Sequence, residues 1–263
     1  MPLFSSTLVA VFSLVLSFIF GTVLASFITC TAGRLLAGMD WVNEHSHCDT
    51  CGHQLGALDL FPIFSYVLLG GKCRYCGAKV PIRCLISEVL LGFVFVGVVL
   101  CHGNIDVVMG RNLLLAMLMM GISFCEIDGK VIHSGFITAM LTIWIGALPF
   151  VPDLKYYIAD GVIACFLYAG AMLLISYMRT QKKKEGIKPE LIKLVAVYLL
   201  YMGLIKGTVA LVVTFLITKI FKTENIVPVM SICTIICLCV GEIVLGANAT
   251  SYINTLIETI RVF

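Results

Sequence analysis

The sequence predicts an all-α protein, a polytopic membrane helical bundle of about eight spans with a small cytoplasmic zinc-knuckle subdomain. Three observations lead to this prediction. Of the 263 residues, 60% are apolar and only 13% are charged, which is outside the usual composition of a soluble domain. The apolar residues form long runs, and such runs are typical of membrane spans. Four cysteines form two CxxCG sequences inside one polar segment.

The apolar runs predict eight membrane-spanning segments. They are residues 7–29, 84–101, 112–126, 134–151, 156–178, 190–204, 206–221 and 226–247. The third run is short, and only GLIKG separates the sixth from the seventh, so one of these is a candidate re-entrant segment. The first run is too long for a secretory signal and no A-x-A-like site follows it, so we expect a retained helix. The predicted domains are 1–34, 35–83 and 84–263.

The lysines and arginines predict the orientation of these spans. With the N-terminus outside, 14 of the 18 basic residues fall on the cytoplasmic side, and 4 fall outside, namely Arg111, Lys155, Lys206 and Arg261. The net charge of +3 therefore reflects membrane orientation, and no nucleic-acid partner is expected. The run KKKEGIK at 182–188 is expected to contact anionic membrane lipid.

The polar segment between the first two spans predicts a structural zinc site. Cys48 and Cys51 form one CxxCG knuckle, Cys73 and Cys76 form the second, and 21 residues separate Cys51 from Cys73. Four thiolates at this spacing are typical of a closed tetrahedral zinc site. A redox pair and free thiols are the alternatives. The flanking histidines are interpreted as loop or outer-shell residues, namely His45, His47 and His53.

The chain resembles the type IV prepilin peptidases at several motifs. FGTVLASFITCTAGRL at 20–35 is similar to a family stretch, although Ala25 replaces a usual glycine. The tetracysteine loop, IRCLISEVLLG at 82–92 and NIVPVM at 225–230 also resemble family segments. The matching residues are Gly21, Ser26, Phe27, Arg34, Arg83, Glu88, Gly92, Ile226 and Pro228.

This resemblance implies an aspartic peptidase of the bacterial inner (cytoplasmic) membrane. Such an enzyme removes the leader from type IV prepilin or pseudopilin precursors, on the cytoplasmic side that also carries the zinc loop. Many relatives then N-methylate the new N-terminus with S-adenosylmethionine, so this cofactor is expected if that activity is retained.

The resemblance also implies two catalytic carboxyl groups at cytoplasmic helix ends, one acting as general base and the other as general acid on a shared water. In FCEIDGKVIHSG at 124–135, Glu126 falls on the first catalytic position and Asp128 lies two residues later. In KEGIKPELIKL, Leu191 falls on the second aspartate position, directly after Glu190. The candidate catalytic residues are therefore Glu126, Asp128 and Glu190, and neither family aspartate is in its usual place.

Other interpretations of these acids remain open. Glu126 and Asp128 also suit a polar loop, and Glu190 suits the first turn of a helix. A catalytically impaired homologue that binds pilins or acts as an assembly factor is the alternative function. Asp160 is expected to cap a helix or make a polar contact, and Glu242 either reaches the interface or relays protons. A transporter would need inverted repeats, which the sequence lacks.

Overall fold

The structure, a computed structural model, describes residues 7–40, 45–151, 154–181, 187–223 and 225–245. These residues form helices, and the only strand-like features among them are two isolated antiparallel bridges. The all-α prediction is confirmed. The helices are α1 Thr7–Ala37, α2 Phe64–Leu68, α3 Ile82–His102, α4 Val107–Gly129, α5 Ser134–Ala147, a 3₁₀ turn Leu148–Phe150, α6 Leu154–Gln181, α7 Pro189–Phe221 and α8 Ile226–Leu245.

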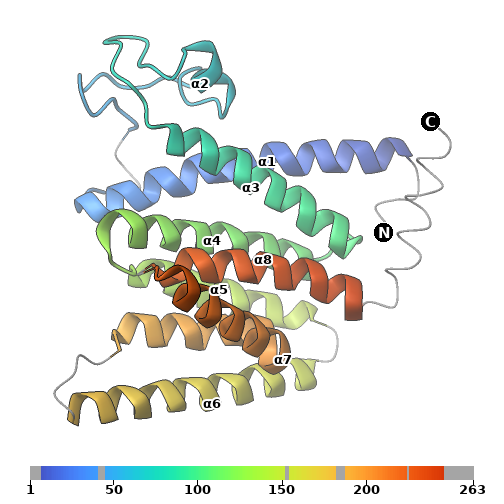
Figure 1. Ribbon diagram of the computed structural model, residues 1–263. Coiled ribbons are helices and arrows are strands. Elements are labelled where there is room, and N and C mark those ends of the chain that lie inside the picture. The colour runs from blue at the N-terminus through green and yellow to red at the C-terminus, as the bar shows by residue number, and fades with distance from the viewer. Residues whose placement is uncertain (1–6, 41–44, 152–153, 182–186, 224, 246–263) are drawn as a thin grey trace. The chain divides into compact units, whose positions relative to one another are not determined.

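The chain forms two compact units. Unit 1 comprises residues 1–105 and 242–263, and it contains α1, α2, α3 and the tetracysteine loop. Unit 2 comprises residues 106–241 and contains α4 to α7 and most of α8, which Figure 1 labels. These units are defined by internal packing, and the division at residues 34 and 83 stays a prediction.

Among the described residues, five helices are long and apolar enough to cross a membrane, judged by length and composition. Two shorter apolar helices lie at Ser134–Phe150 and Ile226–Cys239. Large apolar side chains on these helices point away from the protein, for example Phe12 and Phe166, which are 66% and 76% exposed. Such surfaces suit hydrocarbon, and the chain is a multi-pass membrane protein.

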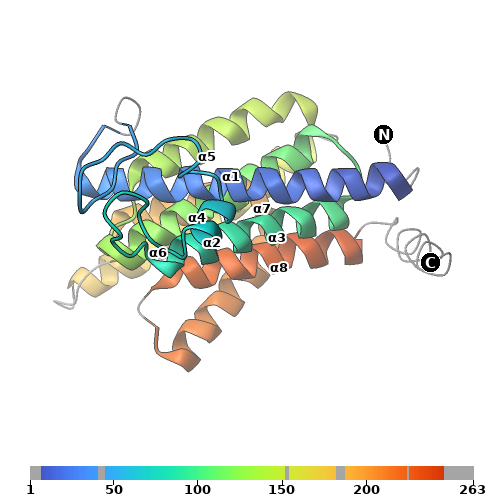
Figure 2. The same ribbon diagram turned by 90° about the horizontal axis from the view of Figure 1, so that it is seen from above.

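In unit 1, helices α1 and α3 pack closely because two glycines meet at their crossing. A Cβ added to Gly21 would lie 2.7 Å from the Leu91 carbonyl oxygen, and one added to Gly92 would lie 2.8 Å from the Phe18 ring. The two helices run side by side in Figures 1 and 2. The resemblance singled out both glycines, and their role here is close backbone approach.

In unit 2, helix α7 is broken at Gly203, the first residue of GLIKG. Gly203 has φ 69° and ψ −174°, a conformation open essentially only to glycine. The break frees two backbone groups, and both are satisfied by side chains: the Leu204 amide donates to Asp160 Oδ2 at 3.1 Å, and Trp144 Nε1 donates to the Leu200 carbonyl at 2.8 Å. The two halves of α7 run in different directions in Figure 1. The predicted interruption at GLIKG is therefore present as a kink inside the single helix Pro189–Phe221, rather than as a boundary between two separate helices, and Asp160 makes the expected polar contact.

Helices α4 and α8 of unit 2 are joined by buried hydroxyl groups. Ser123 and Ser231 Oγ atoms lie 2.8 Å apart, and Ser231 Oγ also lies 3.2 Å from the Met119 carbonyl oxygen. Small hydroxyl residues let two membrane helices approach closely. This contact sets the register between the ends of α4 and α8, where the candidate acids lie.

Candidate functional site

The two CxxCG knuckles have the same backbone geometry. In the first, the Gly52 amide donates to the Cys48 carbonyl at 2.8 Å; in the second, the Gly77 amide donates to the Cys73 carbonyl at 3.0 Å. Both glycines adopt positive φ, 69° and 70°, which lets each turn close under its sulfurs. A single antiparallel β-bridge flanks each knuckle. His47 pairs with Gln54 at the first knuckle, and Lys72 pairs with Lys79 at the second.

The four sulfurs form a cluster that fits a tetrahedral zinc ion. Sγ atoms of Cys48, Cys51, Cys73 and Cys76 all lie within 4.8 Å of one another, and the Cys48–Cys76 pair is 3.8 Å apart. Zinc–sulfur bonds of about 2.3 Å in a tetrahedron place the sulfurs about 3.8 Å apart, so little movement is needed. A cluster closed by four protein ligands leaves no open coordination position, so the bound ion would have a structural role.

The electrostatics of the cluster also suit a cation. The amides of Cys51 and Thr50 point at Cys48 and lower the pKa of its thiol to about 6. The Ala78 amide lowers the pKa of Cys76, but desolvation and the three neighbouring thiols outweigh it and raise this pKa to about 12. The surroundings therefore stabilise the thiolate of Cys48 and destabilise that of Cys76. A bound divalent cation would stabilise both thiolates.

The zinc loop is tied to the helices of unit 1 through a strained turn. Ile63 has φ 62° and ψ −53°, and the Phe64 amide donates to the Pro62 carbonyl at 2.6 Å, which closes a γ-turn. The buried Glu88 of α3 accepts the Ile63 amide at 2.7 Å. A buried carboxylate thus holds a backbone conformation that a β-branched residue rarely adopts. The sequence pattern gave Glu88 no role, since its partner is 25 residues away.

Glu126 lies in the last turn of α4 and contacts the beginning of α8. Its Oε2 accepts the Val227 amide at 2.8 Å. First-turn amides of a helix lack intrahelical partners, and the helix dipole stabilises a carboxylate there. Glu126 therefore caps α8 across 101 residues of sequence.

Glu190 lies in the first turn of α7, as expected for an acid after Pro189. Its Oε1 accepts from Lys193 Nζ at 3.0 Å, whereas its Oε2 is buried without a hydrogen-bond partner in the described part of the chain. Buried acceptors are rarely left in this state, so Oε2 is open to a water or a substrate donor.

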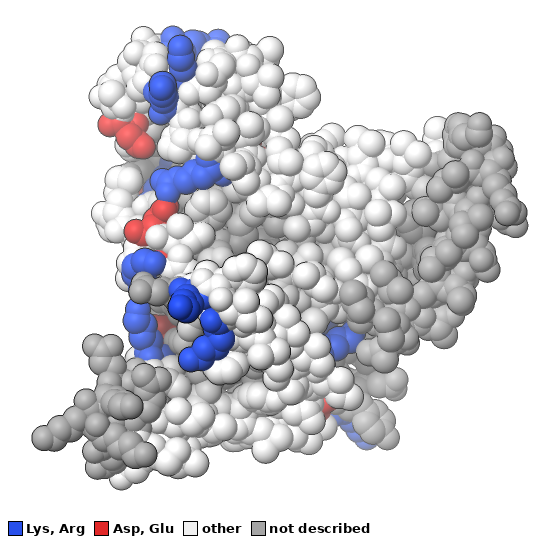
Figure 3. Space-filling view, viewed as in Figure 1, with Lys and Arg blue, Asp and Glu red and all other residues white. Residues whose placement is uncertain are grey.

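Glu126 and Glu190 lie at the same end of unit 2. Lys188 Nζ, two residues before Glu190, donates to the carbonyl of Lys130 at 3.2 Å, one turn after Glu126. Lys130 Nζ in turn donates to Asn225 Oδ1 at 2.6 Å. The start of α7, the end of α4 and the start of α8 therefore meet, and Figure 3 shows lysines and arginines gathered along this edge.

Asp128 is exposed in the last turn of α4. Gly129 stays helical, and the left-handed residue that ends the helix is Lys130, with φ 55° and ψ 24°. His133 caps α5 by accepting the Gly135 amide at Nδ1. Glu242 lies outside the residues whose side chains the structure describes.

Comparison with known proteins agrees with this geometry. Residues 19–102 match the family model of the Bacterial Peptidase A24 N-terminal domain, a segment that contains the zinc loop and the α1–α3 contact. Three curated relatives are each named a prepilin leader peptidase/N-methyltransferase. The protein of Dichelobacter nodosus is 25% identical over a stretch that covers 46% of this chain and 42% of the relative. The protein of Myxococcus xanthus is 28% identical over 42% of this chain and 33% of the relative. The protein of Neisseria gonorrhoeae is 28% identical over 65% of this chain and 59% of the relative.

These matches support membership of the prepilin leader peptidase/N-methyltransferase family, and the family model itself covers residues 19–102. The chain spans between about a third and three fifths of the length of these relatives. No solved structure matches it. The predicted resemblance to this family is confirmed. The roles of Glu126, Asp128 and Glu190 stay predictions.

Proposed function

We propose that this protein acts on a type IV prepilin or pseudopilin precursor as a membrane-embedded leader peptidase. The observation that supports the proposal is that the helix ends bearing Glu126 and Glu190 lie at one end of unit 2, joined by the hydrogen bond from Lys188 to the Lys130 carbonyl, and that Glu190 Oε2 is buried without a partner among the described residues. An aspartic peptidase needs two carboxyl groups near one water, one ionised and one protonated. Glu126 and Glu190 are the proposed pair, and Asp128 is a third acid, exposed in the last turn of α4.

The two acids differ in a way that suggests their roles. Glu126 accepts the Val227 amide in the first turn of α8, where the helix dipole favours a negative charge, and this position suits a general base. Glu190 has one oxygen bound to Lys193 and the other open. Protonated at that open oxygen, it would donate to the scissile carbonyl or the leaving amine as general acid.

Leader removal tests this proposal directly. The purified full-length protein in detergent is incubated with a prepilin bearing a basic leader, and mass spectrometry follows the released leader. Glu126→Gln and Glu190→Gln should each slow cleavage by about 100-fold or more, the usual effect of losing a general acid or base. Asp49→Asn, at an exposed acid of the zinc loop, is the control and should cleave normally. Unchanged cleavage by both Gln variants contradicts the assignment.

A second candidate is a catalytically impaired homologue that binds pilins or serves as an assembly factor. Glu126 already has a structural partner in Val227, and Leu191 stands beside Glu190 where relatives carry the second acid. On this reading the native protein binds a prepilin without cutting it. The double variant Glu126→Asp with Leu191→Asp should then gain cleavage, whereas cleavage by the native protein excludes the reading.

The proposal includes zinc and, if N-methylation is retained, S-adenosylmethionine. Cys48, Cys51, Cys73 and Cys76 would hold the zinc, whose role is to fix the fold of the loop above α1 and α3. Transfer of a labelled methyl group from S-adenosylmethionine to a cleaved pilin tests the second activity.

We also propose that the zinc loop is cytoplasmic and that the membrane is the bacterial inner membrane. The support is the excess of lysine and arginine at the helix ends that share the loop's predicted side. Reporter fusions in the zinc loop and at residue 104 should show opposite orientations.

A further inference from the structure

Arg111 is a buried cation that no carboxylate neutralises in the described part of unit 2. Its side chain lies in the second turn of α4 and the residue is 7% exposed. Its Nε and NH2 groups donate to Asn112 Oδ1 at 3.3 and 3.0 Å, and NH1 donates to the hydroxyl of Tyr157. The guanidinium also lies over the Tyr157 and Tyr201 rings, 5.1 and 5.6 Å from their centroids. Its five N–H groups make three described hydrogen bonds, so two remain available.

The Tyr157 hydroxyl beside Arg111 also has a proton for which the described residues offer no acceptor. Tyr157 Oη accepts from Arg111 and also from Trp144 Nε1 at 2.9 Å. With both of its lone pairs engaged, the hydroxyl can still donate, and no acceptor for its proton is found among the described residues. Arg111 and Tyr157 therefore form a group of donors with a net positive charge. This chemistry favours an anion with several oxygens.

The positions of these residues along their helices suit the depth of a lipid headgroup. Arg111 is four residues after the start of α4, about 6 Å along the helix axis. Trp144 is three residues before the end of α5 and Tyr157 is three residues after the start of α6, so each is about 5 Å from a helix end. The headgroup region of a bilayer is about 5–7 Å thick on each side, and tryptophan and tyrosine are enriched there.

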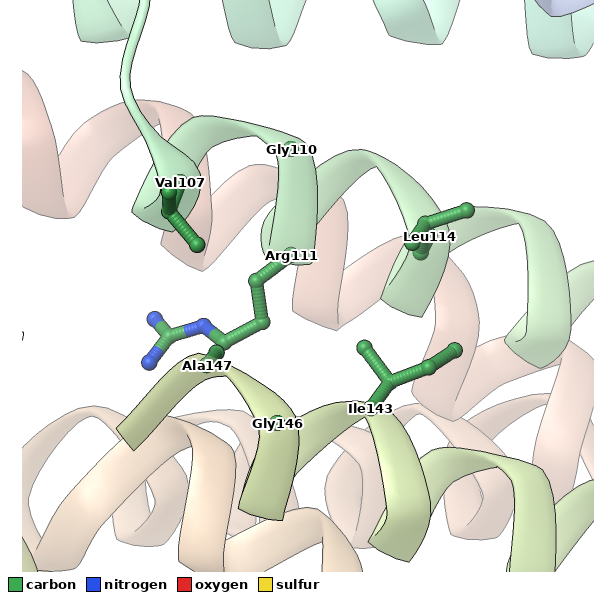
Figure 4. Close-up of a pocket in the computed structure, with 7 residues that line it drawn as sticks. All are labelled: Val107, Gly110, Arg111, Leu114, Ile143, Gly146 and Ala147. Carbon is green, nitrogen blue, oxygen red and sulfur yellow. The ribbon is translucent and has the colours of Figure 1, made fainter. Parts of the chain in front are cut away.

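A groove between α4 and α5 runs from Arg111 away from the start of α4. It has a volume of about 260 Å³ and is lined by Val107, Gly110, Arg111, Leu114, Ile143, Gly146 and Ala147 from α4 and α5. Figure 4 shows the guanidinium at the end of the groove near the helix termini, with Leu114 and Ile143 lining its other end. Gly110 and Gly146 keep the groove open, because a Cβ added to either would meet no atom within 4 Å.

We propose that this groove binds an anionic phospholipid. The phosphate accepts hydrogen bonds from Arg111 and Tyr157 at headgroup depth, and one acyl chain lies over Gly110 and Gly146 against Leu114 and Ile143. The charge of Arg111 selects the occupant: the described residues of unit 2 offer this buried cation no carboxylate, so a lipid with net negative charge is favoured over a zwitterionic one. This site is separate from the acids at the other end of α4, and the inference does not depend on the proposed function.

Lipid binding is measured by native mass spectrometry of the full chain, released from detergent containing phosphatidylglycerol or phosphatidylcholine at equal concentration. The wild type should retain phosphatidylglycerol about tenfold more than phosphatidylcholine, the order expected for one charge-assisted hydrogen bond. Arg111→Gln should abolish this preference and Arg111→Lys should keep part of it. Gly146→Leu fills the groove and should remove retention of both lipids.

Gly170→Leu is the matched control, because Gly170 is also a helical glycine of unit 2 with open space around it, in α6. It should bind both lipids as the wild type does. The proposal is overturned if the wild type shows no preference, if Gly146→Leu binds like Gly170→Leu, or if Arg111→Gln keeps the preference. Inorganic phosphate competing as well as the lipid would show an anion site without an acyl-chain groove, which also overturns it. Thermal unfolding of each variant without lipid verifies that it is folded.

Discussion

The break in α7 gives a quantitative prediction, the destabilisation caused by Gly203→Ala. Alanine must adopt φ 69° and ψ −174° or the turn between the two halves of α7 must change. A non-glycine residue in this region is destabilised by about 1–3 kcal/mol. The added Cβ would also overlap Asp160 Oδ2, so the hydrogen bond from the Leu204 amide would be lost. A hydrogen bond to a charged group contributes about 1.5–3 kcal/mol, and the two effects together give about 4 kcal/mol.

The assay is the free energy of unfolding of the purified protein in mixed micelles titrated with a denaturing detergent. Gly170→Ala is the control: it lies in a regular helix with open space, and there alanine should stabilise by about 0.5–1 kcal/mol. Asp160→Ala should destabilise by the hydrogen-bond part alone. Because both changes remove the same bond, the double variant should be less destabilised than the sum of the single variants. A loss below about 1 kcal/mol for Gly203→Ala would refute the reasoning.

Four further predictions follow from other contacts. Glu126→Ala should destabilise unit 2 by about 1–2 kcal/mol through loss of the α8 cap, while Glu126→Gln, which retains an acceptor, should lose less; thermal unfolding distinguishes them. Ile63→Gly should stabilise the fold by about 1 kcal/mol, because glycine relieves the positive φ of the γ-turn, and the melting temperature should rise. Zinc analysis should find one ion per chain in the wild type and much less in Cys48→Ser; a chelator should make the loop sensitive to protease while the helical circular dichroism of the spans persists. Zinc occupancy at fixed free zinc should fall as the pH drops, because protons compete with the metal for all four thiolates: Cys76, whose pKa is raised, is protonated first, and Cys48, whose pKa is lowered to about 6, is protonated last.

Local patterns determined much of this protein from the sequence alone. Runs of apolar residues predicted the spans, because a segment in hydrocarbon must satisfy its backbone internally and so becomes a helix. The break at GLIKG was also readable, since Gly203 is where an otherwise continuous helix can change direction. Each CxxCG sequence fixes two sulfurs within one turn, so the pairing of Cys48 with Cys51 and Cys73 with Cys76 was predictable.

Only the tertiary structure decided which distant residues meet. Glu126 accepts the amide of Val227, which lies 101 residues away in the sequence. Trp144 donates to the Leu200 carbonyl, 56 residues away, and Arg111 donates to Tyr157, 46 residues away. Hydropathy and motif spacing describe each segment by itself, whereas the burial of a charge or the rescue of a broken helix depends on the helix beside it. The sequence therefore identified Glu126 and Glu190 as candidates. The packing of α4, α7 and α8 decided that Glu126 binds a helix end, whereas Glu190 has a buried oxygen without a partner among the described residues.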